Sequence, residues 1–478
     1  MIENLDAKHV PYLKLIGEVA DSIAQPSYVI GGYVRDFYLQ RIQNQDSIDL
    51  DVVTIGSGLV LAEAVHKALP GSTLSTFKRF GTAMVKHKGI ELEFVGARKE
   101  SYQADSRKPV VEDGSLEDDQ NRRDFTINAL SWCLNEANFG ELVDPFGGIK
   151  DLDAGLIKTP VDPYITFSDD PLRMLRAIRF ATQLYFTIVP ETLEAITKTA
   201  DRIKIISKER IIIELNKILL SPKPSIGFAY LLETGLLKHI LPEMVDLLGV
   251  DVINGQTHKD NFWHTLQVVD NLAHTSDNLY LRWSAVFHDI AKPATKRFHE
   301  TQGWTFHGHE VVGARWMKRI FRRIGLPMDD RLEYVTKMVR LHQRPIALVS
   351  EEVTDSAIRR LIYEAGNDIE ELMDLCTADI TTKSEWRKKK YQNNFGLVRQ
   401  KIKDVEERDQ LRNWKNPITG EEIMHRFGIK PSKKVGLIKD AVKEAILDGD
   451  ILNNEDQARD FMLNYATTEL GLTVKNPS

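Results

Sequence analysis

The sequence predicts an α+β protein, in which a mixed α/β head with an antiparallel or mixed sheet precedes a chain that is helical to its end. Runs typical of β-strands alternate with helical patterns from residue 26 to about residue 150. Beyond residue 160 the strand-like runs fade, and apolar residues recur at the spacing of a helix. These two observations divide the chain into a part with a sheet and an all-α part.

The head is predicted from four short runs with the composition of β-strands, which are residues 27–30, 48–53, 83–86 and 90–95. We expect a leading helix over residues 1–25. Residues 101–121 are polar, charged and without periodicity, which predicts a loop. The head is therefore predicted to cover residues 1–155.

The helical part is divided by changes in composition. We expect a neck over residues 156–250, a histidine-rich domain over residues 251–385 and a tail over residues 386–478. A length of 478 residues suits about three or four domains. Residues 386–403 hold seven basic residues and no acidic one, so this run is predicted either to bind a polyanion or to form a solvated helix face.

The composition argues against several classes of protein. Hydrophobic residues make up 42% of the chain and charged residues 28%, as in soluble globular proteins. Cys133 and Cys376 are the two cysteines and lie far apart, which argues against a disulfide framework or a cysteine zinc site and fits a reducing cytoplasm. The N-terminus lacks the pattern of a secretory signal, and no apolar run is long enough to span a bilayer. We therefore expect a cytoplasmic protein that does not bind a membrane.

The most informative segment is a strand–turn–helix–strand pattern near the N-terminus. Asp49 and Asp51 project from one side of the second strand because side chains alternate along a strand, and such a pair suits Mg²⁺. Gly31 and Gly32 let the backbone approach a phosphate just before the helix that carries Arg35. A metal-binding pair beside a phosphate-binding turn favours nucleotidyl transfer.

Other polar residues of the head are candidates for the same site. Glu93 lies on a later strand and is a candidate third carboxylate of the metal site. A solvated charged side chain on an edge strand is an almost equally good explanation for this residue. Arg122 and Arg123 are adjacent at a predicted helix start and suit a polyanion. Asn128 can hydrogen-bond a sugar hydroxyl. An ordinary helix cap with an ion pair from Asp124 is the alternative for this second group.

A basic helix is predicted to begin at Pro171, a residue that suits the first helical turn. Asp170 and Arg173 are neighbours across one helical turn. A carboxylate acceptor beside a guanidinium donor can recognise the edge of a base by hydrogen bonds. Arg176 and Arg179 continue the stripe at a spacing of three residues. A simple ion pair within the helix is the alternative explanation.

Histidines and aspartates recur in the third predicted domain. His288 and Asp289 are adjacent in an apolar-patterned helix, His264 lies on an earlier helix, and Asp379 follows later. Ligands from several helices can build a hydrolytic centre with one or two metal ions. His307, His309 and His342 follow in the same region. A helical domain that has lost its metal is the alternative, because one His-Asp dipeptide is expected about once by chance.

Taken in this order, the segments resemble those of the class II tRNA nucleotidyltransferases, the family of bacterial CCA-adding enzymes and poly(A) polymerases. The resemblance covers about residues 26–250 and is carried by five segments: residues 31–51, 122–130, 144–152, 169–179 and 209–214. One departure is visible, because the base-reading segment of the family usually begins with Glu-Asp and this one begins with Asp169.

The resemblance implies a role for each group of residues. The aspartate pair would hold two Mg²⁺ ions that activate the 3′-hydroxyl of tRNA and neutralise charge at the α-phosphate. Arg35, Arg122 and Arg123 would grip the triphosphate. Asp170 and Arg173 would select the incoming CTP or ATP without a nucleic-acid template.

Residues 255–385 resemble the HD phosphohydrolase domain that is appended to many tRNA nucleotidyltransferases. His264, His288, Asp289 and Asp379 occupy the positions expected of its metal ligands. The resemblance implies a second divalent metal site and a secondary phosphohydrolase activity.

The sequence therefore predicts a tRNA nucleotidyltransferase that adds CCA, or part of it, to tRNA. A poly(A) polymerase is the alternative within the family, and the motifs do not separate full CCA addition from the addition of C or A alone. A metal-dependent phosphohydrolase with a nucleotide-sensing head is the alternative from another class. An RNA-binding scaffold without turnover is less favoured, because two carboxylates that face a polyanion would not help a simple binder.

Overall fold

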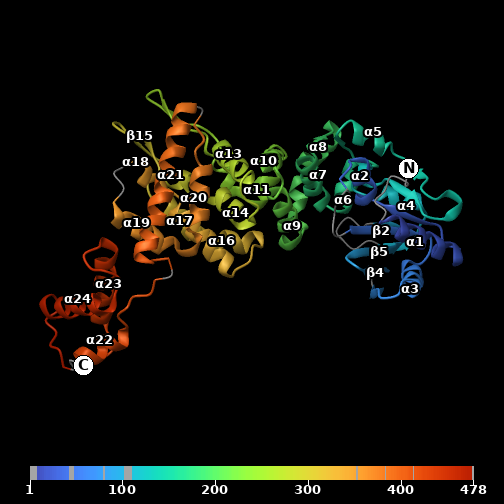
Figure 1. Cartoon of the computed structure of the whole chain (residues 1–478). Helices are drawn as coiled ribbons and strands as arrows, with labels where there is room; N and C mark the ends of the chain where they lie inside the picture. The colour runs from blue at the N-terminus through green and yellow to red at the C-terminus, as the bar shows by residue number, and fades with distance from the viewer. Residues whose placement is uncertain are drawn as a thin grey trace. The chain divides into compact units, whose positions relative to one another are not determined.

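The computed structural model describes residues 8–41, 48–78, 81–101, 110–350, 354–382, 384–412 and 414–475. The chain forms two compact units, Met1–Pro242 and Glu243–Ser478 (Figure 1). The sheet lies in the first unit, and the second unit is mainly helical. The α+β fold class is therefore confirmed, whereas the bounds of the four predicted domains stay predictions.

A seven-stranded sheet forms the centre of the head, in the order β3-β4-β5-β2-β1-β8-β9. The β2 and β5 strands pair in parallel, and the other neighbours pair antiparallel, so the predicted mixed sheet is confirmed. The strands are β1 Ser27–Ile30, β2 Ile48–Thr54, β3 Thr73–Phe77, β4 Thr82–His87, β5 Ile90–Gly96, β8 Ser131–Cys133 and β9 Leu142–Val143.

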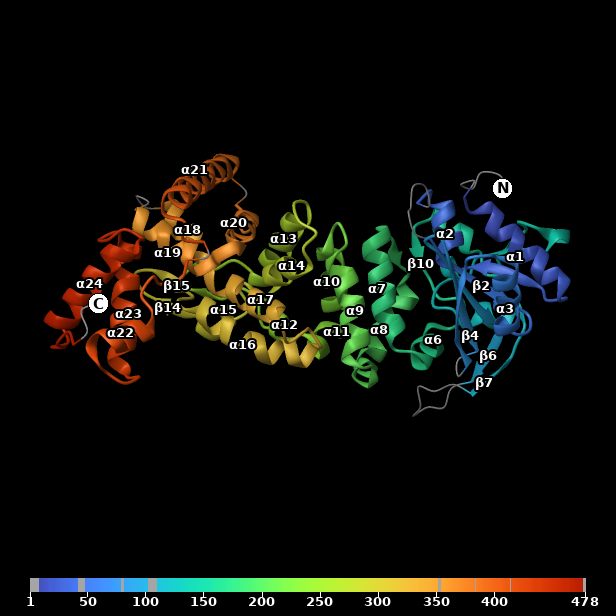
Figure 2. The same cartoon turned by 60° about the horizontal axis from the view of Figure 1, so that its bottom comes forward.

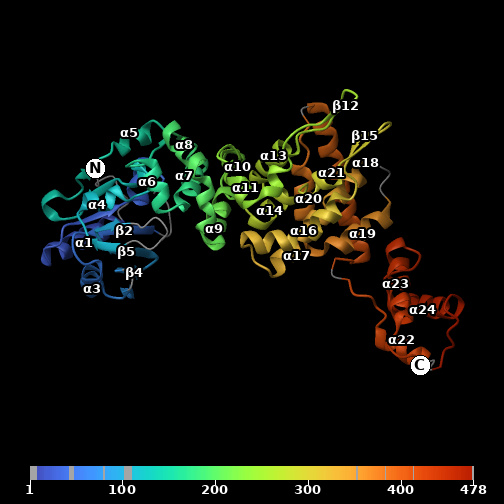
Figure 3. The same ribbon diagram turned by 180° about the vertical axis from the view of Figure 1, so that it is seen from behind.

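One face of this sheet is covered by α1 (Val10–Ser22) and α3 (Gly58–Ala68), which pack against each other and against the strands (Figure 3). Leu50 and Leu92 are fully buried in the core that these helices share with the sheet. Because side chains alternate along a strand, residues one position away on β2 and β5 point to the opposite face. That opposite face carries the predicted metal-binding carboxylates.

The predicted loop over residues 101–121 is wrong for its second half. The β6 strand (Arg98–Ser101) pairs antiparallel with β7 (Val110–Asp113), and α4 (Leu116–Asn121) follows directly. Ser115 and Asp118 form a reciprocal capping box at the start of α4, a local signal that outweighs the missing periodicity of so short a helix. Residues 102–109 lie outside the described part of the chain.

The rest of the first unit consists mainly of short helices after the head. The α7 helix packs against α9 and α10, and the break between α9 and α10 falls at a Ser-Pro-Lys-Pro stretch, residues 221–224. The elements are α2 Gly32–Tyr38, α5 Gly148–Asp153, β10 Leu156–Ile157, α6 Pro163–Asp169, α7 Leu172–Leu184, β11 Thr187–Ile188, α8 Pro190–Thr199, α9 Lys208–Leu219, α10 Pro224–Glu233 and α11 Leu236–Ile240.

The second unit contains the histidine-rich helices and the helical tail that the sequence predicts. Its main helices are α13 Asn261–Ala273, α14 Leu279–Phe287, α16 His309–Ile324, α17 Asp330–Leu341, α18 Gln343–Ser350, α19 Asp355–Ala365, α20 Ile369–Ala378, α21 Glu385–Asp409, α22 Gly420–Phe427, α23 Lys433–Asp448 and α24 Glu455–Thr468. The long α21 helix packs against α18, α19 and α20 (Figure 2). Among the described residues, we find no helix with both the length and the apolar character needed to cross a bilayer.

Candidate active sites

Three predicted carboxylates meet on the face of the head sheet opposite to α1 and α3. Parallel pairing places Asp51 directly opposite Glu93, and Asp49 lies two residues before Asp51 on the same face. Burial raises the pKa of all three carboxyl groups, and for Asp49 and Glu93 the charges of the neighbouring carboxylates raise it further. Nearby basic side chains offset only part of this effect, and a cluster of oxygen ligands with excess negative charge suits a hard divalent cation.

A glycine turn brings the backbone beside these carboxylates. Gly31 precedes α2 with φ of 86° and ψ of −133°, a conformation that favours glycine. A Cβ atom at this position would lie 3.0 Å from Nη1 of Arg123 and 3.5 Å from Oδ2 of Asp51. Gly32 begins the helix, and the nearest atom to a Cβ there would be Nη2 of Arg35, at 3.7 Å. The predicted turn therefore lies against Asp51 and against the guanidinium groups of Arg123 and Arg35.

Arg35 and Asn128 belong to one hydrogen-bond network. Nη1 of Arg35 donates to Oδ1 of Asn128 at 2.7 Å, and Nε of Arg35 binds Asp36 at 2.8 Å. Asn128 in turn donates from Nδ2 to Oδ1 of Asp124 at 2.9 Å. Arg35 and Asn128 are both buried. The network fixes the orientation of Arg35, which the sequence predicts as a triphosphate ligand.

Arg122 and Arg123 lie at the end of α4, so their predicted position at a helix start is wrong. The fully buried Asp119 binds both of them: Oδ1 accepts from Nη2 of Arg122 at 2.5 Å, and Oδ2 accepts from Nη2 of Arg123 at 3.2 Å. The alternative explanation for this segment expects an ion pair from Asp124, and Asp119 takes that role. The spacing of three and four residues between Asp119 and the arginines is the signal that could have identified it.

Asp124 instead holds Arg176 of α7. Its Oδ2 accepts from Nε of Arg176 at 2.7 Å. Burial would raise the pKa of Asp124, but the Arg176 guanidinium and the Asn128 amide hold it below its ordinary value. This contact ties the first half of α7 to the segment that carries Arg122 and Arg123.

The two predicted base-reading side chains are also held in place. Oδ2 of Asp170 accepts from Nη2 of Arg210 at 2.7 Å, and Oδ1 accepts from the backbone of Leu172 at 3.1 Å. Arg173 donates from Nη2 to the carbonyl of Arg122 at 2.5 Å. Asp170 and Arg173 therefore share one end of α7, and a neighbouring helix positions the first of them.

Arg179 lies on the buried side of α7, and it shares the Phe180 ring with Arg176. Its Nε donates to Oε2 of Glu214 at 2.6 Å, its guanidinium lies 4.0 Å from the ring centroid of Phe180, and both charged groups are buried. Burial lowers the pKa of Arg179 even though Glu214 opposes this effect. The geometry gives Arg179 a positioning role between α7 and α9.

Replacing Glu214 with alanine is expected to destabilise the first unit by about 3 kcal/mol, because it leaves the Arg179 charge buried without a partner. Thermal unfolding should show a melting temperature lower by about 5–10 °C. Glu194→Ala is the matched control, because Glu194 forms an exposed pair with Lys198 and its loss should leave the melting temperature unchanged. Equal effects of the two substitutions would contradict the positioning role.

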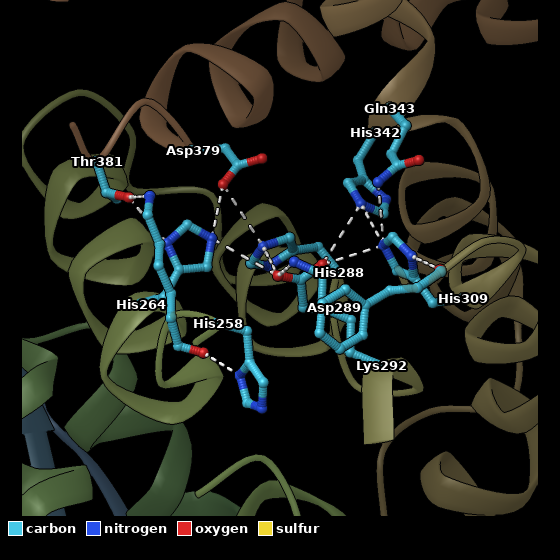
Figure 4. Close-up of polar contacts among 12 residues, drawn as sticks. His258, His264, His288, Asp289, Lys292, His309, His342, Gln343, Asp379 and Thr381 are labelled. Atoms are coloured by element: carbon cyan, nitrogen blue, oxygen red, sulfur yellow. Dashed lines mark hydrogen bonds and ion pairs between the residues drawn. The ribbon is translucent and has the colours of Figure 1, made fainter. Parts of the chain in front are cut away.

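The predicted ligands of the second unit come together with two further histidines (Figure 4). One triad contains His264, His288 and Asp379, and the other contains Asp289, His309 and His342. Within each triad the ligand atoms lie within 4.8 Å of one another. The residues come from α13, the ends of α14, α17 and α20, and the start of α16.

Asp289 joins the two triads. Its Oδ2 lies 3.2 Å from Nε2 of His288 and 3.6 Å from Nε2 of His264. Its Oδ1 lies 3.1 Å from Nε2 of His309 and 3.8 Å from Nε2 of His342. One carboxylate that offers a different oxygen to each triad is the arrangement of a ligand that bridges two metal ions.

Each histidine of the cluster presents Nε2 to the centre because its Nδ1 contacts a neighbouring group. The Nδ1 atoms of His288, His309 and His342 lie 2.7–2.8 Å from the backbone carbonyls of Ala285, Phe306 and Val339. Such contacts fix the ring orientation and tautomer of metal-binding histidines. Nε2 of His288 is buried and has no well-aligned hydrogen-bond partner in the described part of the chain, as expected of a ligand atom.

The electrostatics of the cluster favour bound positive charge. Burial would lower the pKa of His288, but Asp289 and Asp379 raise it to about 8. Burial and the nearby His288 lower the pKa of His342 to about 3. Burial would raise the pKa of Asp379, but the hydrogen bond from His264 and the charge of His288 hold it at about 2. Four imidazoles and two carboxylates form a donor set that suits first-row divalent metals.

His309 and His342 are visible in the sequence, but their spacing does not identify them as ligands. Both side chains are 2% exposed, and their Nε2 atoms lie 3.3 Å apart. His307, two residues from His309, is exposed and does not belong to either triad. Burial of the imidazole ring distinguishes His309 and His342 from His307, and the sequence does not show this burial directly.

Three family models match successive parts of the chain. A poly(A) polymerase head domain matches residues 27–158, and a probable RNA- and SrmB-binding site of polymerase A matches residues 185–248. An HD domain matches residues 261–382. The fold and the head carboxylates therefore define a nucleotidyltransferase with an HD domain.

Curated relatives identify the family. The A-adding tRNA nucleotidyltransferase of Deinococcus radiodurans is 31% identical over 365 residues, which are 74% of this chain and 80% of that protein. The multifunctional CCA protein of Cupriavidus metallidurans is 33% identical over 64% of this chain and 72% of its own. The chain belongs to the tRNA nucleotidyltransferase family, which includes CCA-adding enzymes. The fold agrees with the CCA-adding enzyme of Thermotoga maritima, at 23% identity and a TM-score of 0.62 over 97% of each chain.

Proposed function

We propose that the protein adds CCA, or part of it, to the 3′ end of tRNA, with CTP and ATP as the donors. The observation that carries this proposal is the carboxylate cluster of Asp49, Asp51 and Glu93 beside the Gly31 turn. The names of the relatives support it, because one is described as A-adding and another as a multifunctional CCA protein.

The head carboxylates fit Mg²⁺. They offer only oxygen ligands, and burial together with mutual repulsion raises the pKa of Asp49 and Glu93, so a bound dication would relieve an unfavourable charge cluster. Asp49 and Asp51 would be the principal ligands, with Glu93 opposite Asp51 as the third. When bound, Mg²⁺ neutralises charge at the α-phosphate and lowers the pKa of the attacking hydroxyl.

The surrounding residues would bind and orient the nucleotide. Arg35, Arg122 and Arg123 would hold the triphosphate, because guanidinium groups bind phosphate oxygens in a fork and these three are fixed by carboxylate or amide partners. Asp170 and Arg173 would recognise the base, one as the acceptor and the other as the donor. Arg176 would hold this end of α7 to Asp124.

The test is to incubate the full chain with tRNA that lacks its terminal CCA and to supply CTP and ATP separately and together. The expected result is extension by C, by A or by both at the correct positions, followed by termination. Sequencing of the product ends distinguishes full CCA addition from partial addition. Extension of any RNA by ATP alone, with CTP ignored, would contradict the proposal and indicate a poly(A) polymerase.

We also propose a second activity, metal-dependent phosphoester hydrolysis at the HD cluster. The observation that favours it is Asp289, whose two oxygens face separate triads of ligand atoms. The proposal is supported by the buried Nε2 of His288, which faces the Asp289 carboxylate, and by the histidine rings that backbone carbonyls hold in place. When bound, the metal ions activate a water molecule and stabilise charge on the phosphoryl oxygens.

A further inference from the structure

A cavity of about 870 Å³ opens beside the HD cluster and reaches two of its members, His264 and Asp379. Its volume is in the range of pockets that bind small molecules. The cavity therefore gives a ligand direct access to one of the two triads, and the side chains that line the rest of it indicate the chemistry of that ligand.

The far wall of the cavity comes from α21, which begins after the last residue of the HD match. Arg387, Tyr391 and Phe395 line the cavity at intervals of four residues, so one face of this helix is turned towards it. Phe395 is 3% exposed and anchors the helix, whereas Tyr391 is 41% exposed. The first turns of α21 thus complete a pocket whose other walls belong to the HD domain.

The exposed groups in the cavity combine aromatic rings with positive charge. Trp263 on α13 is 51% exposed and lines the same cavity as Tyr391. The Arg387 side chain is also exposed and forms no ion pair or hydrogen bond with the described residues. Aromatic faces stack on nucleobases, and a free guanidinium binds phosphate.

Building on the hydrolytic function proposed above, we propose that this pocket binds a nucleotide phosphoester, with the base on Trp263 and Tyr391 and the phosphate at Arg387. The ligand is either a free nucleoside monophosphate or the phosphorylated end of an RNA, since both present the same base and phosphate. Helix α21 is then part of the substrate site of the HD centre. Arg387, the first basic residue of this helix, then has a role distinct from general RNA binding by the basic residues of the run 386–403.

The test measures binding rather than turnover, so it does not depend on a metal-loaded enzyme. The full chain, treated with a chelator, is titrated by calorimetry with adenosine 3′-monophosphate, a trinucleotide RNA with a 3′-phosphate, and inorganic phosphate. Tyr391→Ala and Trp263→Ala should each weaken binding of the two nucleotide probes about tenfold and leave inorganic phosphate unaffected. Arg387→Ala should weaken all three, and Tyr391→Phe should restore the affinity.

Two neighbours on the same helix are matched controls. Trp386 is 70% exposed and Lys389 is exposed, and neither lines the cavity, so Trp386→Ala and Lys389→Ala should leave each affinity unchanged. Nucleotide bound at the head contributes equally in all variants, because the substitutions lie in the other compact unit. The relative affinities for the monophosphate and the trinucleotide show which of the two is the better ligand.

The outcomes separate the pocket from the hydrolytic function. Unchanged nucleotide affinity in Tyr391→Ala and Trp263→Ala, or an equal loss in Trp386→Ala, would overturn the pocket assignment. The hydrolytic function would be refuted if the wild type hydrolysed no phosphoester with added Mn²⁺. If the pocket variants still lost nucleotide binding in that case, the binding site would be supported without the hydrolytic function.

Discussion

Replacing Asp51 with asparagine is expected to reduce nucleotide incorporation about a thousandfold and to leave tRNA binding unchanged. Asp51 lies opposite Glu93 in the parallel strand pair and next to the Gly31 turn. It is therefore the carboxylate that contacts both the second carboxylate strand and the predicted phosphate-binding turn. Loss of its charge removes a metal ligand, and metal ions supply several kcal/mol of transition-state stabilisation, which corresponds to about three orders of magnitude in rate. Single-turnover incorporation of labelled CTP and ATP measures the effect.

The matched control for this prediction is Glu63→Gln. Glu63 is an exposed carboxylate on α3, the helix that covers the opposite face of the sheet, so its loss should leave incorporation unchanged. Filter binding of tRNA shows whether each variant still recognises its substrate. Asp51→Asn activity within tenfold of the wild-type value would contradict the metal-binding role of the head carboxylates.

The central strands of the head and its aspartate pair could be predicted because their signals are local. Alternation along β2 places Asp49 and Asp51 on one face whatever their surroundings. The parallel register that sets Asp51 against Glu93 is a non-local pairing, and the sequence alone could only offer Glu93 as a candidate. The structure brings these residues together, although their roles as ligands stay predictions.

The partners of the arginines were harder to predict. Asp119 is close in sequence to Arg122 and Arg123, but it was hidden in a segment that lacks periodicity and was predicted as a loop. Arg179 has the same spacing as the other arginines of α7, yet only the packing of α9 turns it towards Glu214. A stripe of like residues on a helix therefore does not show which members are buried.

The HD cluster illustrates the same limit. The His288–Asp289 dipeptide marks the domain, and the four predicted ligands do meet in the structure. The second triad needs His309 and His342, which lie on different helices and are separated from Asp289 by 20 and 53 residues in the chain. Histidines of this kind are visible in the sequence, but their convergence depends on how the helices pack.

Replacing Asp289 with asparagine is expected to abolish tight divalent metal binding in the second unit without affecting nucleotide incorporation. The substitution removes the negative charge that both triads share and leaves four histidines facing one another with a single carboxylate, Asp379. Metal content after loading with Mn²⁺ and dialysis should fall from about two ions per chain to none. Hydrolysis of a phosphoester probe should fall about a thousandfold, as expected when metal activation of water is lost.

Asp277→Asn is the matched control, because this fully exposed carboxylate on the same unit pairs with Arg282 and offers no atom to either triad. Its metal content and hydrolysis should equal those of the wild type. Two outcomes would contradict the two-activity scheme: retention of metal and hydrolysis by Asp289→Asn, or a loss of CCA addition in that variant. Asp51 and Asp289 lie in different compact units. Loss of nucleotide incorporation in Asp51→Asn, with metal content and hydrolysis unchanged, would therefore show that the two activities depend on separate sites.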